Sequence, residues 1–227
     1  MDWFFLAFWA AVGGLAVRIY FERSGGREAR INRQLARRRR VLIRQAREGL
    51  VCLLGHTQAA DELLAAPITL RQCLAFQLTV TEHSQNWSVV VLEEGRSVPF
   101  RVVDSSGEAR VVLDGSRWIV LEADAGGQVG GWLDHSPLDD QHRRLLSLLK
   151  SRGIETEAVW GRKRFSFDER ILGIESADVV LGAAFWEAAP DGERQTPRGV
   201  TEQLVLRNTE EHPLVISNAR AARAGNS

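Results

Sequence analysis

The chain has 227 residues, 44% of them hydrophobic, and its two cysteines are too few for a disulfide framework. This length suffices for one membrane segment and one domain of roughly 150–180 residues with a sizeable core. The formal net charge of zero averages two opposed regions. Residues 18–47 hold eleven arginines and two glutamates, a net charge of +9, and residues 48–227 carry −8. The two regions therefore have different partners.

The N-terminal residues form the longest apolar stretch of the chain. Residues 3–17 contain no charged side chain, and the apolar run resumes at residues 19–21. As a helix these residues would rise about 28 Å, close to the roughly 30 Å of a hydrocarbon core. We therefore predict a transmembrane anchor over residues 1–21, in which Arg18 snorkels towards the head groups.

The flanks of this segment favour a retained anchor. Trp3, Trp9 and Tyr20 are typical of the aromatic belts of membrane helices. The alternatives are a cleaved signal peptide and a buried core helix of a soluble protein. A signal peptide needs a positively charged start, and here the start is Met1-Asp2. No small-residue cleavage motif follows the apolar run.

Cations gather on the C-terminal side of the anchor, and those expected to contact lipid are Arg23, Arg27, Arg37, Arg38, Arg39 and Arg40. The positive-inside rule then places all later residues in the cytoplasm and Met1 outside.

The residues that follow the anchor form an arginine collar. Residues 22–49 predict an amphipathic helix, because apolar residues recur at helical spacing and residues 27–48 contain no glycine or proline. Three interpretations stay open: a solvated stalk that sets topology, attachment to anionic lipid at roughly 1 kcal/mol per cation, and nucleic-acid binding. The collar lacks interleaved aromatic residues, which disfavours nucleic acid.

After residue 49 the pattern changes to short apolar runs divided by turn residues. The runs are Leu50–Leu54, Cys73–Thr81, Trp87–Leu92, Phe100–Val103, Ala109–Leu113, Trp118–Leu121, Arg164–Phe167, Val179–Phe185, Gln203–Leu206 and Leu214–Ser217. We predict a mainly β domain over residues 50–218, either an antiparallel sandwich or an OB-like barrel, and a disordered tail over residues 219–227. The clearest hairpin covers residues 100–112.

One helix is expected to interrupt the strands. Ser136 is its predicted capping residue, Pro137 its first residue, and Gly153 its end. Residues 126–131 predict a flexible stretch before it, and residues 190–199 a mobile loop. We expect a domain beginning near residue 49 to be stable by itself.

Few side chains indicate a catalytic, metal-binding or cofactor-binding site. His135, Asp139 and His142, with two neighbouring aspartates, form the only local group of metal-ligand types, and helix capping explains them better than a site does. There is no phosphate-binding loop and no nucleophile motif. Cys52 and Cys73 are expected to be buried thiols, and Trp87, Trp118 and Trp160 to pack in the core. The sequence therefore predicts no enzyme and no cofactor.

A family resemblance covers about residues 50–218. Residues 63–76 resemble the "SPL…(R/E)C.YY" strand of the GIDE, or BAM (beside a membrane), domain, which occurs in the mitochondrial ubiquitin ligase MULAN and in RING-less bacterial proteins. Further motifs follow in the family's order, and the matching positions are Pro67, Cys73, Trp87, Pro99, Phe100, Asp104, Gly107, Glu169 and Gly182. The aromatic pair after Cys73 is reduced to Phe76, and the family's RING and second transmembrane segment are absent.

The resemblance implies a β-rich domain that binds or senses a partner beside the bilayer, with no ubiquitin-ligase activity because the zinc ligands are missing. We therefore expect a non-catalytic, membrane-tethered interaction or regulatory module with an unidentified protein partner, and the bacterial relatives imply a bacterial inner membrane as its location. The alternative is a membrane-perturbing effector in stress or phage defence.

Overall fold

The computed structural model describes residues 35, 37–84, 86–113, 118–120, 125–131, 139–158, 161–188 and 202–218. The predicted anchor, residues 22–34 of the collar, the loop at 190–199 and the tail lie outside these ranges. Among the described residues, no helix has the length and apolar character to cross a membrane. The anchor and the tail therefore stay predictions.

Five strands close into a small barrel. In spatial order they are β1 (Gly49–Ala59), β6 (Phe100–Asp104), β7 (Gly107–Val112), β13 (Glu202–Arg207) and β12 (Ala177–Ala188). The barrel closes because β12 pairs back onto β1. Only the pairing of β7 with β13 is parallel in this barrel. Two strands, β14 (Leu214–Asn218) and β8 (Trp118–Val120), continue the sheet from β12.

Alternate residues of the barrel strands fill its interior, as the two-residue period of a strand requires. On β1 the inward side chains include Val51 and Leu53, and on β6 they include Phe100 and Val102. The hairpin predicted over residues 100–112 is confirmed as β6 and β7. A mainly β fold with one helix is likewise confirmed, and all ten predicted runs overlap strands.

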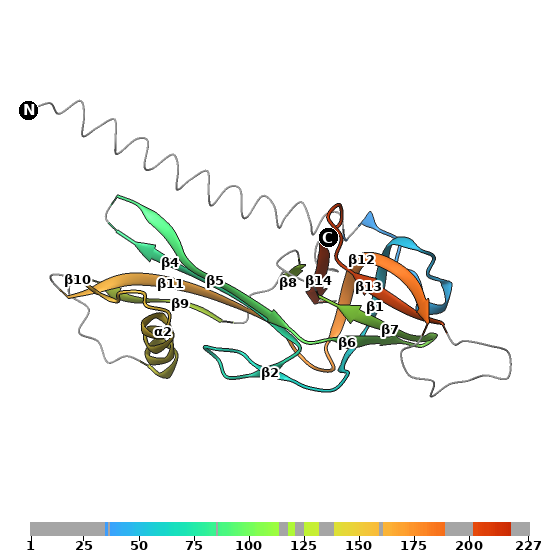
Figure 1. The fold of residues 1–227 in the computed structure, drawn as a ribbon, viewed down its shortest axis with the longest axis horizontal. Helices are drawn as coiled ribbons and strands as arrows, with labels where there is room; N and C mark the ends of the chain where they lie inside the picture. Colours follow the sequence, from blue (N-terminus) through green and yellow to red (C-terminus); the bar gives the residue numbers. More distant parts are fainter. Residues whose placement is uncertain are drawn as a thin grey trace, which may run out of the picture.

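Two long insertions build a second sheet beside the barrel. The first, between β1 and β6, supplies β4 (Ala75–His83) and β5 (Ser88–Ser97). The second, between β7 and β12, supplies β9 (Ala125–Gly131), β10 (Glu157–Ala158) and β11 (Gly161–Leu172). β11 pairs with β4 on one side and with β9 and β10 on the other. The molecule is therefore elongated, with the barrel at one end and this sheet at the other (Figure 1).

The helix α2 (Asp140–Ser151) covers one face of the second sheet. Its Leu145 and Leu149 are buried against Phe165 and Phe167 of β11. The helix begins three residues later than predicted, because Asp139 is the capping residue, and its carboxylate accepts a hydrogen bond from the His142 N–H at 2.8 Å.

The arginine helix predicted over residues 22–49 is wrong for residues 38–48. A short 3-10 helix, η1 (Ile43–Gln45), is the only helical part of this stretch. Val41 instead forms a parallel bridge with Leu53 of β1, and Ile43 and Ala46 are buried in the barrel core. The gain from burying these apolar side chains outweighs the continuation of an exposed basic helix.

The glycine-rich stretch at residues 126–131 was also misassigned, since it forms most of β9. Glycine suits this strand because β9 approaches β11 closely. A Cβ at Gly127 would lie 3.2 Å from the Phe167 ring, and a Cβ at Gly126 would lie 3.3 Å from the Phe167 carbonyl oxygen. β2 (Leu64–Ala65) and β3 (Gln72–Cys73) form a further small hairpin, which the sequence pattern did not separate from β4.

Candidate functional site

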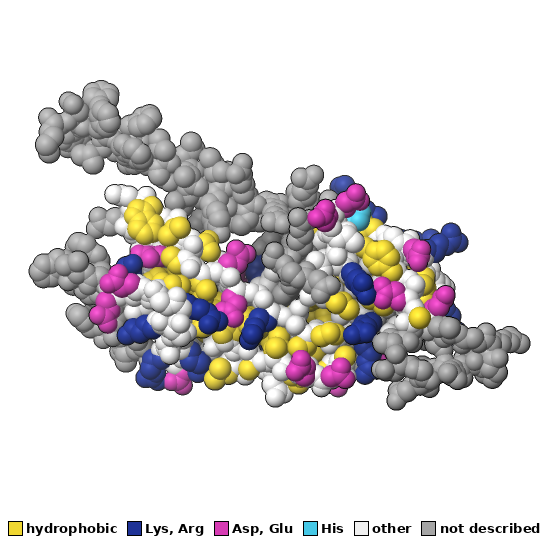
Figure 2. All heavy atoms as spheres, in the orientation of Figure 1, with side chains coloured by type: hydrophobic (Ala, Val, Ile, Leu, Met, Phe, Trp, Pro, Cys, Tyr) yellow, Lys and Arg dark blue, Asp and Glu magenta, His cyan; other side chains and the backbone are white. Residues whose placement is uncertain are grey.

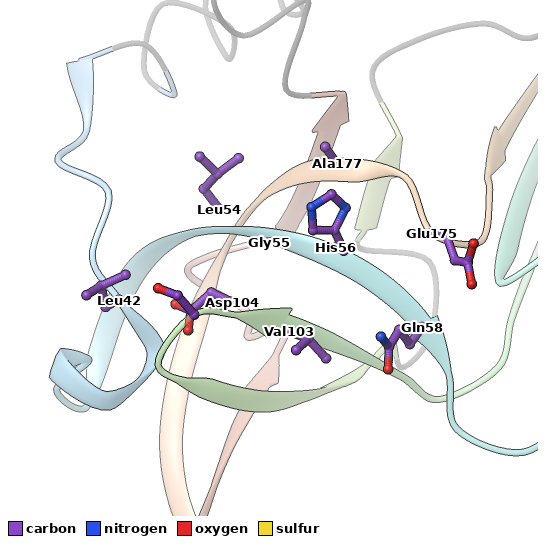
Figure 3. A pocket seen from close by; sticks show the side chains of 10 residues that line it. Leu42, Leu54, Gly55, His56, Gln58, Val103, Asp104, Glu175 and Ala177 are labelled. Carbon is purple, nitrogen blue, oxygen red and sulfur yellow. The ribbon is translucent and has the colours of Figure 1, made fainter.

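A hollow of about 760 Å³ lies on the outer surface of the barrel. We call it the barrel groove; it is lined by Leu42, Leu54, Gly55, His56, Gln58, Val103, Asp104, Ser105, Glu175 and Ala177. Figure 3 shows the His56 ring near its middle, with the two leucines toward one end and Gln58 and Glu175 toward the other.

The groove forms where β1 changes partners. Residues 49–56 of β1 pair with β12, and residues 56–59 pair with β6. Gly55 lies at this change, and a Cβ there would come within 2.6 Å of the Val103 carbonyl oxygen. Glycine is thus required for β6 to approach β1 so closely. The outward residues that follow, His56 and Gln58, form the floor of the groove.

A buried polar network supports this floor from inside. The Thr57 hydroxyl contacts the carbonyl oxygen of Gly173 at 3.1 Å and the Asp178 carboxylate at 3.3 Å. The Ser176 hydroxyl also donates to Asp178. Thr57 and Asp178 are both buried, so this network fixes the turn between β11 and β12 and thereby the position of Glu175.

The groove combines apolar and polar groups. Leu42, Leu54 and Val103 offer apolar surface, whereas the side chains of His56 and Glu175 make no hydrogen bond or ion pair with other described residues and are exposed. Side chains of this kind are available to an incoming ligand. The described part of the chain contains no group of histidine, cysteine or acidic side chains that could hold a metal ion.

Asp104 lines the groove, but its carboxylate oxygens already accept hydrogen bonds from within the chain. Its carboxylate accepts hydrogen bonds from the N–H of Ile43 at 2.8 Å, of Ser106 at 2.6 Å and of Gly107 at 3.0 Å. Partial burial raises the pKa of Asp104, but the hydrogen bonds from Ser106, Ile43 and Gly107 outweigh burial, so the pKa lies below its ordinary value. Asp104 therefore stays ionised at neutral pH and serves the hairpin turn.

The other family-motif positions have packing roles. The buried Glu169 carboxylate accepts from the N–H of Ile68 at 2.7 Å and holds the turn that follows Pro67. Cys73 is buried in a small apolar cluster with Ala66, Phe76 and Ile171. The remaining motif positions are Pro99 and Phe100 before and in β6, Gly107 at its turn, and Gly182, whose Cβ would lie 3.1 Å from Leu214.

Trp87 does not pack in the core as predicted. Its side chain is 47% exposed at the tip of the β4–β5 hairpin. Trp118 and Trp160 are not among the side chains described. Cys52 and Cys73 are buried as predicted, and burial raises the pKa of Cys52 although the nearby Arg40 and Arg38 lower it.

The predicted cluster at the helix start is only partly described. His135 lies outside the described residues, whereas Asp139 is the capping residue and its carboxylate also lies 3.0 Å from the His142 ring. Asp139 thus caps the helix in place of the predicted Ser136. Of the lipid-contact predictions, Arg37 to Arg39 are exposed and Arg40 is partly buried, and Trp3, Trp9, Arg18, Tyr20, Arg23 and Arg27 lie outside the described residues.

Sequence reasoning missed one histidine with two hydroxyl partners. The ring of His83 lies 2.6 Å from the Ser166 hydroxyl and 2.8 Å from the Ser88 hydroxyl. The three residues lie on neighbouring strands, on the face of the second sheet opposite α2. Burial and the Arg164 charge lower the pKa of His83, so the ring is neutral. The barrel groove lies elsewhere, and we assign this network to strand cohesion.

Neither family models, curated proteins nor solved structures gave a significant match to this chain.

Proposed function

We propose that this chain is a non-catalytic interaction or regulatory module, tethered by residues 1–21 to a bacterial inner membrane and facing the cytoplasm. Its barrel groove takes the partner. The observation that carries the proposal is the continuity between the arginines and the groove: Arg40 is two residues from Leu42, a groove residue, and Ile43 is fixed in the barrel core.

This continuity explains how a tether would position the groove. The Ile43 N–H donates to Asp104, and Leu35 is buried on the outside of the barrel against Cys52 and Val179. The segment that follows the predicted anchor is therefore bound to the barrel at two places. A partner in the groove would be held within a short distance of the bilayer, close to the exposed Arg37 to Arg39.

The fold and the motifs support the same proposal. A closed five-stranded barrel favours an OB-like architecture over a sandwich, and OB barrels bind ligands on their outer strand faces. The proposed kinship with the RING-less GIDE/BAM domains fits one contact between two of its motif segments, since the Glu169 carboxylate accepts from the N–H of Ile68, the residue after Pro67.

The test uses the full chain produced in bacterial cells, with a photo-crosslinking amino acid in place of Gln58 on the groove floor. We expect a discrete adduct with a protein partner in the membrane fraction. Ser147, an exposed residue of α2, is the matched control position and should give none. Adding Ala177→Arg, which fills the groove from its rim, should abolish the adduct and leave the membrane location unchanged.

Two results would oppose the proposal. Extraction of the chain from membranes by alkaline carbonate would contradict the anchor. Equal adducts at positions 58 and 147, or an adduct at 58 that survives Ala177→Arg, would contradict the role of the groove.

A further inference from the structure

The lining of the barrel groove contains acidic side chains that no cation balances. Asp104 and Glu175 are acidic, and no lysine or arginine is among the described residues that line the groove. The Asp104 carboxylate keeps its negative charge although its oxygens already accept hydrogen bonds. Arg101, which the strand register places opposite Gln58, is not part of the lining and lies 3.6 Å from Glu108. The groove therefore attracts a cation and disfavours an anion.

Glu175 is the carboxylate of the lining that is available to a ligand. Its side chain is exposed and makes no ion pair or hydrogen bond with another described residue. Its backbone is fixed, because its N–H donates to the carbonyl oxygen of Thr57 at 2.7 Å, and the Thr57 N–H donates to the carbonyl oxygen of Ser176 at 3.0 Å. Glu175 has a φ of +56°, in the left-handed region that a glutamate rarely adopts. Backbone strain of this kind clusters at positions that present a side chain to a ligand.

The opposite end of the groove is apolar. Figure 3 shows Leu42 and Leu54 towards this end and Glu175 at the other. Leu42 is 41% exposed, whereas the neighbouring Ile43 is buried in the barrel core. The barrel itself therefore does not cover Leu42, and a ligand that does so gains the free energy of apolar burial.

The spacing between the two ends fits an extended peptide. Leu54, His56 and Gln58 are alternate residues of β1 on its outer face, and they extend over about 13 Å at about 3.3 Å per residue. The hydrogen bond between Glu175 and Thr57 places Glu175 about 10 Å along the strand from Leu54. An extended peptide has the same rise, and its alternate side chains share a face. Side chains two or four positions apart in such a peptide therefore reach both ends of the groove.

The wider surface shows no charge pattern of this kind on the face drawn in Figure 2. Lysine and arginine side chains are interspersed there with aspartate and glutamate side chains over the described part of the chain. Nucleic acid is recognised through a basic patch or stripe, and this face shows none. The charges of the groove thus favour a peptide over a nucleic acid.

We propose that the barrel groove binds an extended peptide segment that carries an apolar side chain and, two or four positions away, a lysine or an arginine. This inference rests on the proposed function, because it names the chemistry of the partner that the groove takes. The apolar side chain lies against Leu42 and Leu54, and the cation pairs with Glu175. The exposed His56 ring, between the two ends, is positioned to hydrogen-bond the peptide backbone.

The test selects ligands for the full chain, held in nanodiscs of phosphatidylcholine, from a phage library of random heptapeptides. The Ala177→Arg chain, in which the groove is filled from its rim, removes peptides that bind elsewhere. We expect the remaining peptides to share an apolar residue with a lysine or arginine two or four positions away. In a chain with Glu175→Lys, the same selection should replace that cation by aspartate or glutamate, because the attraction is reversed.

Fluorescence anisotropy with the selected peptide then measures each end of the groove. Glu175→Gln should weaken binding about two- to fivefold at low salt and have little effect at high salt. Glu155→Gln, which removes an equal charge from an exposed residue after α2, should have no effect. Leu42→Ser should weaken binding at both salt concentrations, and Val89→Ser, at an exposed apolar residue of β5, should not.

The outcomes separate this inference from the proposed function. Selection of acidic or purely apolar peptides, or no enrichment over the Ala177→Arg chain, would overturn the inference. Equal effects of Glu175→Gln and Glu155→Gln would also overturn it. In each case the proposed function would stand if the adduct at position 58 forms and Ala177→Arg abolishes it. Equal adducts at positions 58 and 147 would overturn the proposed function itself.

Discussion

The Glu169 carboxylate and the backbone N–H of Ile68 form a buried hydrogen bond of 2.7 Å between residues 101 positions apart. The second carboxylate oxygen accepts from the Thr69 N–H at 3.0 Å. Glu169 belongs to β11 and Ile68 to the turn after Pro67, so one side chain joins the two insertions that make the second sheet. A buried carboxylate is tolerated here because two backbone donors satisfy it.

We predict that Glu169→Gln destabilises the protein by about 1–3 kcal/mol, because the amide keeps only one acceptor and turns its N–H₂ group toward a donor. Urea unfolding of the detergent-solubilised chain, followed by circular dichroism, measures the change. Glu202→Gln is the matched control, since Glu202 is exposed and has no described partner. Equal midpoints for the two variants would show that the turn at Pro67 holds without Glu169.

Gly55 should tolerate no side chain. Its Cβ would lie 2.6 Å from a backbone oxygen of Val103 and 2.7 Å from a methyl group of Val102, and the backbone atom cannot move without opening the β1–β6 pairing. We expect Gly55→Ala to cost about 2 kcal/mol or more and to change ligand capture in the groove. Gly173→Ala is the control, because a Cβ there meets nothing within 4 Å. Similar thermal midpoints for both variants would contradict the close approach.

The Asp104 carboxylate should contribute to the loss of folding stability at low pH. The pKa of Asp104 in the folded chain lies below its ordinary value of 3.8, so its hydrogen bonds stabilise the fold above that pH, and this stability is lost as the pH falls below it. We expect Asp104→Asn to cost about 1–2 kcal/mol at pH 7, with a difference from the parent that shrinks towards pH 3. Urea midpoints at pH 7, 5 and 3 test this. A difference that does not depend on pH would show that the charge is unimportant.

The sequence pattern located the strands well because their apolar alternation is local. The hairpin at residues 100–112 and the end of α2 at Gly153, where φ is +72°, followed from turn chemistry alone. Barrel closure did not, since it depends on the pairing of β12 with β1, over 120 positions away. The groove was missed for the same reason: His56 has an ordinary strand position, and only the change of partners at Gly55 exposes it. Trp87 was misjudged because a strand-like run does not tell a hairpin tip from a core strand.

The last prediction concerns the arginine collar and where the folded domain begins. The sequence suggested a stable domain from residue 49, but Leu35, Ile43 and Ala46 are buried in the folded chain. A chain that begins at Gly49 loses these side chains and the hydrogen bond from Ile43 to Asp104, so we expect it to be less stable by about 4 kcal/mol or more than a chain that begins at residue 35. Unfolding curves of the two chains measure the difference.

In the full chain, Ile43→Ala should cost about 2–4 kcal/mol and Leu42→Ala, at the exposed neighbour, less than about 0.5. Equal stability of the two truncated chains would mean that residues 35–48 do not stabilise the barrel. It would thereby contradict a rigid link between the arginines and the groove.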